Sequence, residues 1–151
     1  MSRLLGVDHI AIAVQDLDRA TLEWQKRYGL RIGEREVVPE QGVEVQMLYA
    51  GDTRIELVQP LSDDSPVHKF LLKNGEGLHH LAFAVNDCQA AMDQSSQDGA
   101  QMINPQPRTG AHQTTIAFVH PKSANGVLLE LVEGGDGPWN NHPQAEAGHE
   151  S

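Results

Sequence analysis

The apolar positions of the chain form two patterns that match each other. Residues 9–16 read HIAIAVQD and residues 80–87 read HLAFAVND, with five of the eight positions identical. Both segments alternate between faces as a half-buried strand does. Each half of the chain then closes with the triplet ELV, at 56–58 and at 130–132. A duplicated supersecondary unit accounts for these matches, and an internal repeat of this kind determines the architecture.

Each repeat reads as one strand, one helix and three further strands, a βαβββ module. Asp16 and the segment Asp64-Ser65-Pro66 are typical helix starts. The spacing predicts strand 5–14, helix 17–27, strands 31–37, 42–50 and 53–59, connector helix 67–74, strand 78–85, helix 87–97, and strands 101–103, 114–120 and 127–131. We therefore expect one α+β domain over 1–133, with module one at about 5–62, the connector at about 64–75 and module two at about 76–133.

Each repeated strand places a histidine on a face that is otherwise lined by small residues. His9 shares its face with alanines, while isoleucines and a valine occupy the other face, and His80 has the same arrangement. The large residues predict contact with a helix layer, whereas the alanine face leaves space. In the closing strands Glu56 and Glu130 each lie between two apolar neighbours that point into a core. Both carboxylates are therefore predicted on the opposite face.

If the sheet curls around a cleft, these four side chains converge there. The alternative is that each histidine is a satisfied core residue and each carboxylate faces water. Two carboxylates brought together without a cation would be costly in desolvation and repulsion, and the pattern occurs twice. We predict a metal site of His9, Glu56, His80 and Glu130, with ligands that suit Co, Mn, Ni, Zn or Fe. The repeat aligns His80 with His9, so His79 is predicted to point the other way, as a structural residue or a partner of a ligand.

Composition narrows the classes of partner. The 151 residues include 11 Lys and Arg against 21 Asp and Glu, which gives a formal charge of −10. Such a charge disfavours nucleic acid and anionic membrane surfaces, and no apolar run approaches the roughly 20 residues of a membrane helix. One cysteine, Cys88, and no recognisable signal peptide favour a cytoplasmic protein.

The last segment, 134–151, loses all periodicity. It carries three acidic residues and no Lys or Arg, so we expect a mobile acidic tail. His142 and His149 are interpreted there as solvated residues rather than metal ligands.

Several segments together resemble one family. They are DHIAIAV at 8–14, PEQGV at 39–43, IELVQPL at 55–61, DSPVHKFL at 64–71, GEGLHHLAF at 75–83, HPKS at 120–123 and GVLLELVE at 126–133. The combination resembles the vicinal oxygen chelate superfamily and, within it, the methylmalonyl-CoA epimerases. The resemblance implies two paired βαβββ modules that form a cupped eight-stranded sheet around a metal site.

The resemblance also implies an activity. It assigns one divalent ion (Co, Mn, Ni or Zn) to His9, Glu56, His80 and Glu130, and acid/base roles to Glu40 and Glu130 on opposite sides of the substrate α-carbon. Some family members have Gln at the Glu56 position, so this site is more anionic. The implied reaction converts (R)- and (S)-methylmalonyl-CoA into each other by removal and return of the α-proton through a metal-stabilised enolate.

The implied partner is an acyl-CoA thioester, and the resemblance suggests a homodimer. Lys122 in HPKS is the best candidate for an electrostatic contact with CoA, and the weaker candidates are Lys69, Lys73 and Arg108. For each of them a solvated surface side chain is at least as common.

Three alternative functions are found in the same superfamily. Lactoylglutathione lyases also use a metal, but they tend to carry an arginine in the first strand, and HIAIAV has none. Extradiol dioxygenases use two His and one Glu, so a fourth ligand argues against them. Ligand-sequestering proteins of the bleomycin-resistance type have no use for four ligands.

Overall fold

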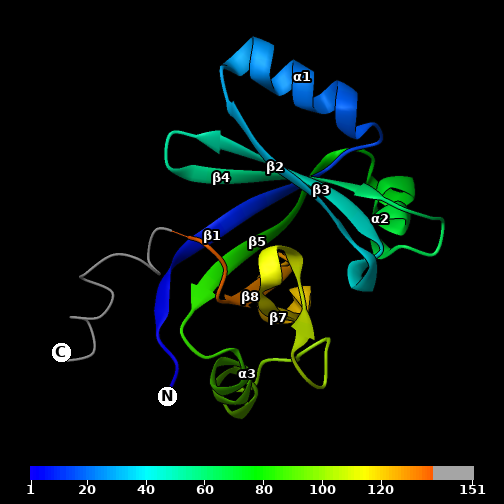
Figure 1. Ribbon diagram of the computed structural model, residues 1–151. Coiled ribbons are helices and arrows are strands. Elements are labelled where there is room, and N and C mark those ends of the chain that lie inside the picture. Colours follow the sequence, from blue (N-terminus) through cyan, green and yellow to red (C-terminus); the bar gives the residue numbers. More distant parts are fainter. Residues whose placement is uncertain (138–151) are drawn as a thin grey trace. The chain divides into compact units, whose positions relative to one another are not determined.

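The computed structural model describes residues 1–137, and their elements follow the two predicted βαβββ series (Figure 1). The first series is β1 (Leu4–Ala13), α1 (Leu17–Tyr28), β2 (Arg31–Val38), β3 (Val43–Ala50) and β4 (Thr53–Pro60). Helix α2 (Pro66–Asn74) follows it. The second series is β5 (Gly77–Val85), α3 (Cys88–Gln97), β6 (Arg108–Thr109), β7 (Thr115–Val119) and β8 (Leu129–Glu133).

Residues 138–151 lie outside the described part, and with them most of the predicted tail, His142 and His149 included. Among the described residues, no helix is both long and apolar enough to cross a membrane.

Hydrogen bonds join the strands in the order β2-β3-β4-β1-β5-β8-β7-β6, a mixed sheet of eight strands. The second half of this order is the mirror of the first, with each strand replaced by its counterpart in the other repeat. Strand β1 is parallel to β4, whereas β3 is antiparallel to both β2 and β4. The α+β class and the duplicated modules are thus confirmed.

The chain forms two compact units, and His9–Leu81 is one of them. Helix α1 begins at Asp16, whose side chain accepts a hydrogen bond from the Arg19 N–H, and ends at Gly29 in the left-handed conformation. The helix lies against β2, β3 and β4 (Figure 1). The core of the unit His9–Leu81 consists of Val14, Leu17, Ala20, Leu30, Leu48 and Leu57. Val14 belongs to this core and Ile12 packs against it, so these two large residues after His9 face the helix, as the alternation predicted.

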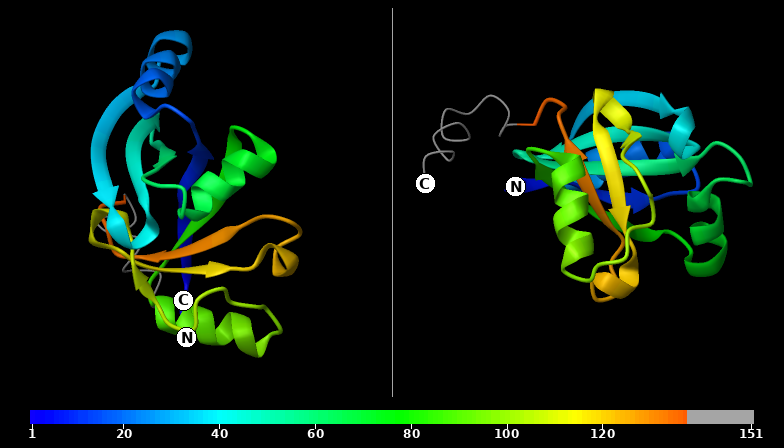
Figure 2. Two further views of the ribbon diagram at one scale, coloured as in Figure 1. Left: turned by 90° about the vertical axis from the view of Figure 1, so that its right-hand side faces the viewer. Right: turned by 90° about the horizontal axis from the view of Figure 1, so that it is seen from below.

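The other unit contains Met1–Asp8 and the chain from Ala82 onward. Helix α3 starts at the N-cap Asp87 and lies along β7 and β8, the yellow and orange strands of Figure 2. The core of this second unit consists of Val85, Cys88, Met92, Ala117, Val119 and Leu131. Glu130 is buried and pairs in register with Phe118. Because Leu129 and Leu131 belong to the α3 side, the carboxylate of Glu130 lies on the other face, as predicted.

The predicted strand at 101–103 is reduced to a single bridge to β7, in which the Ile103 N–H donates to the Phe118 carbonyl and the His120 N–H to the Gln101 carbonyl, both at 2.8 Å. The segment contributes one isolated bridge, between Met102 and Val119, and the paired strand β6 comes later, at Arg108–Thr109. The buried side chain of Asn104 accepts the Phe118 N–H at 2.9 Å, so a side chain takes the place of a ladder partner. Pro105 follows at once and has no N–H to donate.

The packing of α1 on the sheet predicts a large effect at Leu48, which is 0% exposed. Replacement of this residue by alanine should lower the free energy of unfolding by about 2–5 kcal/mol, because the methyl groups leave a cavity. The same replacement at Leu72, which is 76% exposed on α2, should change it by less than about 0.5 kcal/mol. Urea unfolding followed by circular dichroism measures both, and equal effects would contradict the packing described here.

Candidate metal centre

Three of the four predicted ligands meet within the unit His9–Leu81. Donor atoms of His9, Glu56 and His80 all lie within 4.8 Å of one another. The Nε2 atoms of His9 and His80 are 3.1 Å apart, and His9 Nε2 is 3.6 Å from Glu56 Oε1. The three residues are 6%, 5% and 9% exposed. The structure therefore buries a carboxylate beside two imidazole rings.

The donor set fits a divalent ion. The two imidazole Nε2 atoms are 3.1 Å apart, close enough for one ion to contact both, because bonds from zinc to histidine nitrogen are about 2.0–2.1 Å long. An N–H···N hydrogen bond spans the same distance when one ring is protonated at Nε2. Nitrogen and carboxylate ligands without sulfur suit first-row divalent ions, and a cation offsets the cost of burying Glu56. The buried His-Glu-His triad is thus a site that can hold a divalent metal ion.

Small side chains make room for the triad. Strand β1 is parallel to β4, with Ala11 in register with Glu56. Ala11 lies two residues after His9, on the same face, and is fully buried. Its single methyl group leaves the space into which the His9 ring and the Glu56 carboxylate extend. The alanine face of the repeat, read from the sequence as open, is the face that carries the site.

His79 contacts a member of the triad rather than joining it. Its Nδ1 lies 2.8 Å from Nδ1 of His80, and the two rings meet at 76°. The ring of Phe70, from α2, contacts His79 edge-on at 4.9 Å between centroids. The sequence predicted His79 as a structural residue or a partner of a ligand, and the contact with His80 agrees with the second description.

A buried arginine, missed in the sequence analysis, lies beside Glu56. Arg54 is 6% exposed, and it shares the face of Glu56 because the two are two residues apart on β4. Its register partner is Tyr49, whose ring lies under the Arg31 guanidinium at 4.4 Å and against Gly33. The alternation that placed Glu56 on this face also applies to Arg54, and it would have identified this positive charge.

Glu40 lies on a 3-10 helix, Pro39–Gln41, between β2 and β3, and is exposed. The turn ends at Gly42, with φ +66°, where an added Cβ would come 3.4 Å from Cβ of Ser65. The Gly42 carbonyl accepts the Leu61 N–H at 2.9 Å. The loop of Glu40 is thus attached to the end of β4 and the start of α2, and the acid/base role of Glu40 stays a prediction.

The remaining predicted residues lie on other elements. Glu130 belongs to β8 of the other unit, and its place as a fourth ligand stays a prediction. Lys122 is exposed on a 3-10 helix, Pro121–Ser123, where its N–H donates to His120 Nδ1 at 3.0 Å. The weaker CoA candidates are also exposed, Lys69 and Lys73 on α2 and Arg108 on β6.

Cys88 does not provide a reactive thiolate. Burial raises the pKa of the Cys88 thiol to about 11, and the carboxylates of Glu133, Asp87 and Glu130 add to the shift. The thiol is therefore protonated at neutral pH, as a structural core residue is.

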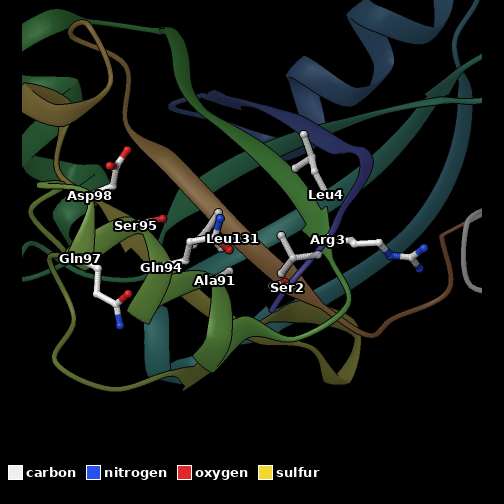
Figure 3. Close-up of a pocket in the computed structure, with 10 residues that line it drawn as sticks. Ser2, Arg3, Leu4, Ala91, Gln94, Ser95, Gln97, Asp98 and Leu131 are labelled. Carbon is white, nitrogen blue, oxygen red and sulfur yellow. The ribbon is translucent and has the colours of Figure 1, made fainter. Parts of the chain in front are cut away.

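A groove of about 700 Å³ lies outside the triad, between α3 and the start of β1 (Figure 3). It is lined by Ser2, Arg3, Leu4, Val85, Ala91, Gln94, Ser95, Gln97, Asp98 and Leu131. The side chain of Arg3 points away from the α3 residues, and the other polar groups are the amides of Gln94 and Gln97, the hydroxyls of Ser95 and Ser2 and the carboxylate of Asp98 (Figure 3). No histidine lines the groove, so it has none of the donor chemistry of the triad.

The comparisons with known proteins agree with the geometry. The profile of the glyoxalase/bleomycin resistance protein/dioxygenase superfamily matches residues 8–118. The uncharacterized protein YqjC of Bacillus subtilis is 42% identical, over 94% of this chain and 99% of its own length. The ethylmalonyl-CoA/methylmalonyl-CoA epimerase of Cereibacter sphaeroides is 39% identical, over 84% of this chain and 96% of its own.

A solved structure is also similar. It is a variant of Streptomyces coelicolor methylmalonyl-CoA epimerase in complex with 2-nitronate-propionyl-CoA, with a TM-score of 0.85 and 38% identity over 89% of this chain and 100% of that chain. The profile match, these identities and the buried triad lead to one conclusion. The chain belongs to the glyoxalase/bleomycin resistance protein/dioxygenase superfamily and is related within it to the methylmalonyl-CoA epimerases.

Proposed function

We propose that the chain is a metal-dependent epimerase of methylmalonyl-CoA. The observation that carries the proposal is the buried triad of His9, Glu56 and His80 in a chain so similar to epimerases of this substrate. The buried carboxylate and two imidazoles, on a face otherwise lined by alanines, form a donor set that suits a divalent ion.

In this proposal His9, Glu56 and His80 hold one divalent ion, of Co, Mn, Ni or Zn, and Glu130 is the fourth ligand. The ion, when bound, supplies positive charge to the thioester and carboxylate oxygens of the substrate, which makes the α-proton more acidic. Arg54 adds a fixed positive charge to the face of β4 that carries Glu56. It helps to balance the negative charge that develops on the substrate.

Glu40 and Glu130 are the proposed acid/base pair. The carboxylate of Glu40 removes the α-proton, and the electron pair of the C–H bond moves into the two adjacent carbonyl groups. Glu130 carries the proton at the start, on the carboxylate oxygen that would not bind the ion, and returns it to the opposite side of the α-carbon. At the end Glu40 is protonated and Glu130 is ionised, the arrangement required for the reverse reaction.

The proposed partner is the CoA thioester itself, with Lys122 as a contact for the phosphate groups of CoA. A homodimer and a cytoplasmic location complete the proposal. Neither nucleic acid nor a membrane surface is expected as a partner, because the chain carries a formal charge of −10.

Removal of one imidazole tests the metal site. In His9→Ala the affinity of the metal-free protein for Co²⁺ should fall by more than the roughly 10–100-fold that loss of an outer partner causes, and epimerisation should fall to background. Isothermal titration calorimetry measures the affinity. His68→Ala is the control, because His68 lies on α2 with its Nε2 3.6 Å from Asp63. Unchanged Co²⁺ affinity in His9→Ala would refute the site.

Loss of the proposed base tests the acid/base assignment. Glu40→Gln keeps the size of the side chain but cannot carry the proton, so epimerisation should fall by at least about 100-fold. Metal content should stay at the wild-type level. Proton NMR in deuterated water measures exchange of the α-proton from each epimer separately. Glu44→Gln, four residues along on β3, is the matched control. Wild-type turnover in Glu40→Gln would show that Glu40 is an ordinary loop residue.

A further inference from the structure

The contact between His79 and His80 constrains where the protons of these rings lie. Their Nδ1 atoms are 2.8 Å apart, the distance of a hydrogen bond, so one nitrogen donates and the other accepts. An imidazole that binds a metal through Nε2 is neutral and carries its proton on Nδ1. For His80 to act as a ligand, its Nδ1–H must therefore donate to His79.

The same tautomer agrees with the other contact of His80. With the proton on Nδ1, the Nε2 of His80 carries a lone pair and lies in the triad, 3.1 Å from His9 Nε2. The contacts of the His80 ring with His79 and with His9 are then compatible with the same tautomer. A His80 ring protonated on Nε2 would instead accept the Nδ1–H of His79, and its Nε2 could not bind a metal.

His79 is itself held in place from the other side. The ring of Phe70 meets it edge-on, with an interplanar angle of 78°. Phe70 belongs to α2, which is capped at its start by the buried Ser65, whose Oγ accepts the Val67 N–H. The half-buried His79 thus contacts both Phe70 of α2 and His80.

We infer that His79 is a positioning residue for the metal centre. Its Nδ1 accepts the Nδ1–H of His80, which fixes both the tautomer and the orientation of that ligand. The inference rests on the metal site of the proposed function. It adds that the site needs a third histidine, which never touches the ion. Partners of this kind typically change metal affinity by about 10–100-fold.

Two substitutions separate the hydrogen bond from the packing. His79→Phe keeps an aromatic ring against Phe70 but removes the acceptor. His79→Asn loses the ring but places an amide oxygen close to the position of Nδ1. We expect Co²⁺ affinity of the metal-free protein to fall by about 10–100-fold in His79→Phe and to stay within about threefold in His79→Asn. His68→Phe is the control for the substitution itself and should bind like wild type.

The tautomer provides a readout independent of metal and activity. Long-range ¹H–¹⁵N NMR of the metal-free wild type at about pH 8.5, where imidazole is neutral, should show His80 protonated on Nδ1. In His79→Phe the proton should be distributed over both nitrogens. A wild-type His80 protonated on Nε2 would overturn the inference, and so would an unchanged affinity in His79→Phe.

The experiment distinguishes this inference from the proposed function. If wild type binds Co²⁺ and His9→Ala does not, the metal site stands whatever His79 does. Equal affinity in His79→Phe and wild type then rejects only the positioning role. If wild type and His9→Ala bind Co²⁺ equally, the metal site itself is wrong, and the positioning role is rejected with it.

Discussion

A carboxylate buried between two imidazoles is the constraint on which the site depends. Glu56 is 5% exposed, and its Oε1 lies 3.6 Å from His9 Nε2. An ionised carboxylate withdrawn from water needs positive charge or several hydrogen bonds nearby. A divalent ion between Glu56, His9 and His80 meets that need with a single bound group. The alanines of β1 and the register that pairs Ala11 with Glu56 are the structural conditions for it.

In each repeat, the face that packs against a helix is different from the face that carries the polar side chains. In the unit His9–Leu81, α1 covers the face of the strands opposite the triad, and its apolar contacts include Leu48 and Leu57, both fully buried. In the other unit α3 covers β7 and β8 in the same way. Because helix packing occupies one face of each repeat, the other face is available for polar side chains.

Helix α2 connects two parts of the proposed machinery. Ser65 at its start lies against Gly42, which ends the turn that carries Glu40. One and a half turns later, Phe70 lies against His79, the neighbour of His80. A helix of nine residues thus supports the loop of the proposed base and the partner of a proposed ligand. The N-cap Ser65 and the proline that follows it define where α2 begins, and they therefore help to position both contacts.

The sequence alone determined the repeat, the α+β class and most element bounds. It also predicted that His9, Glu56 and His80 meet, because the alternation of faces along a strand and the duplication can both be read directly from the sequence. Only the tertiary structure showed that β6 starts at Arg108, since the side chain of Asn104 takes an N–H that a strand would have used. It also revealed the buried charge of Arg54 and the contact from Phe70 through His79 to His80. These contacts depend on how a helix packs against a strand, and strand periodicity carries no information about that packing.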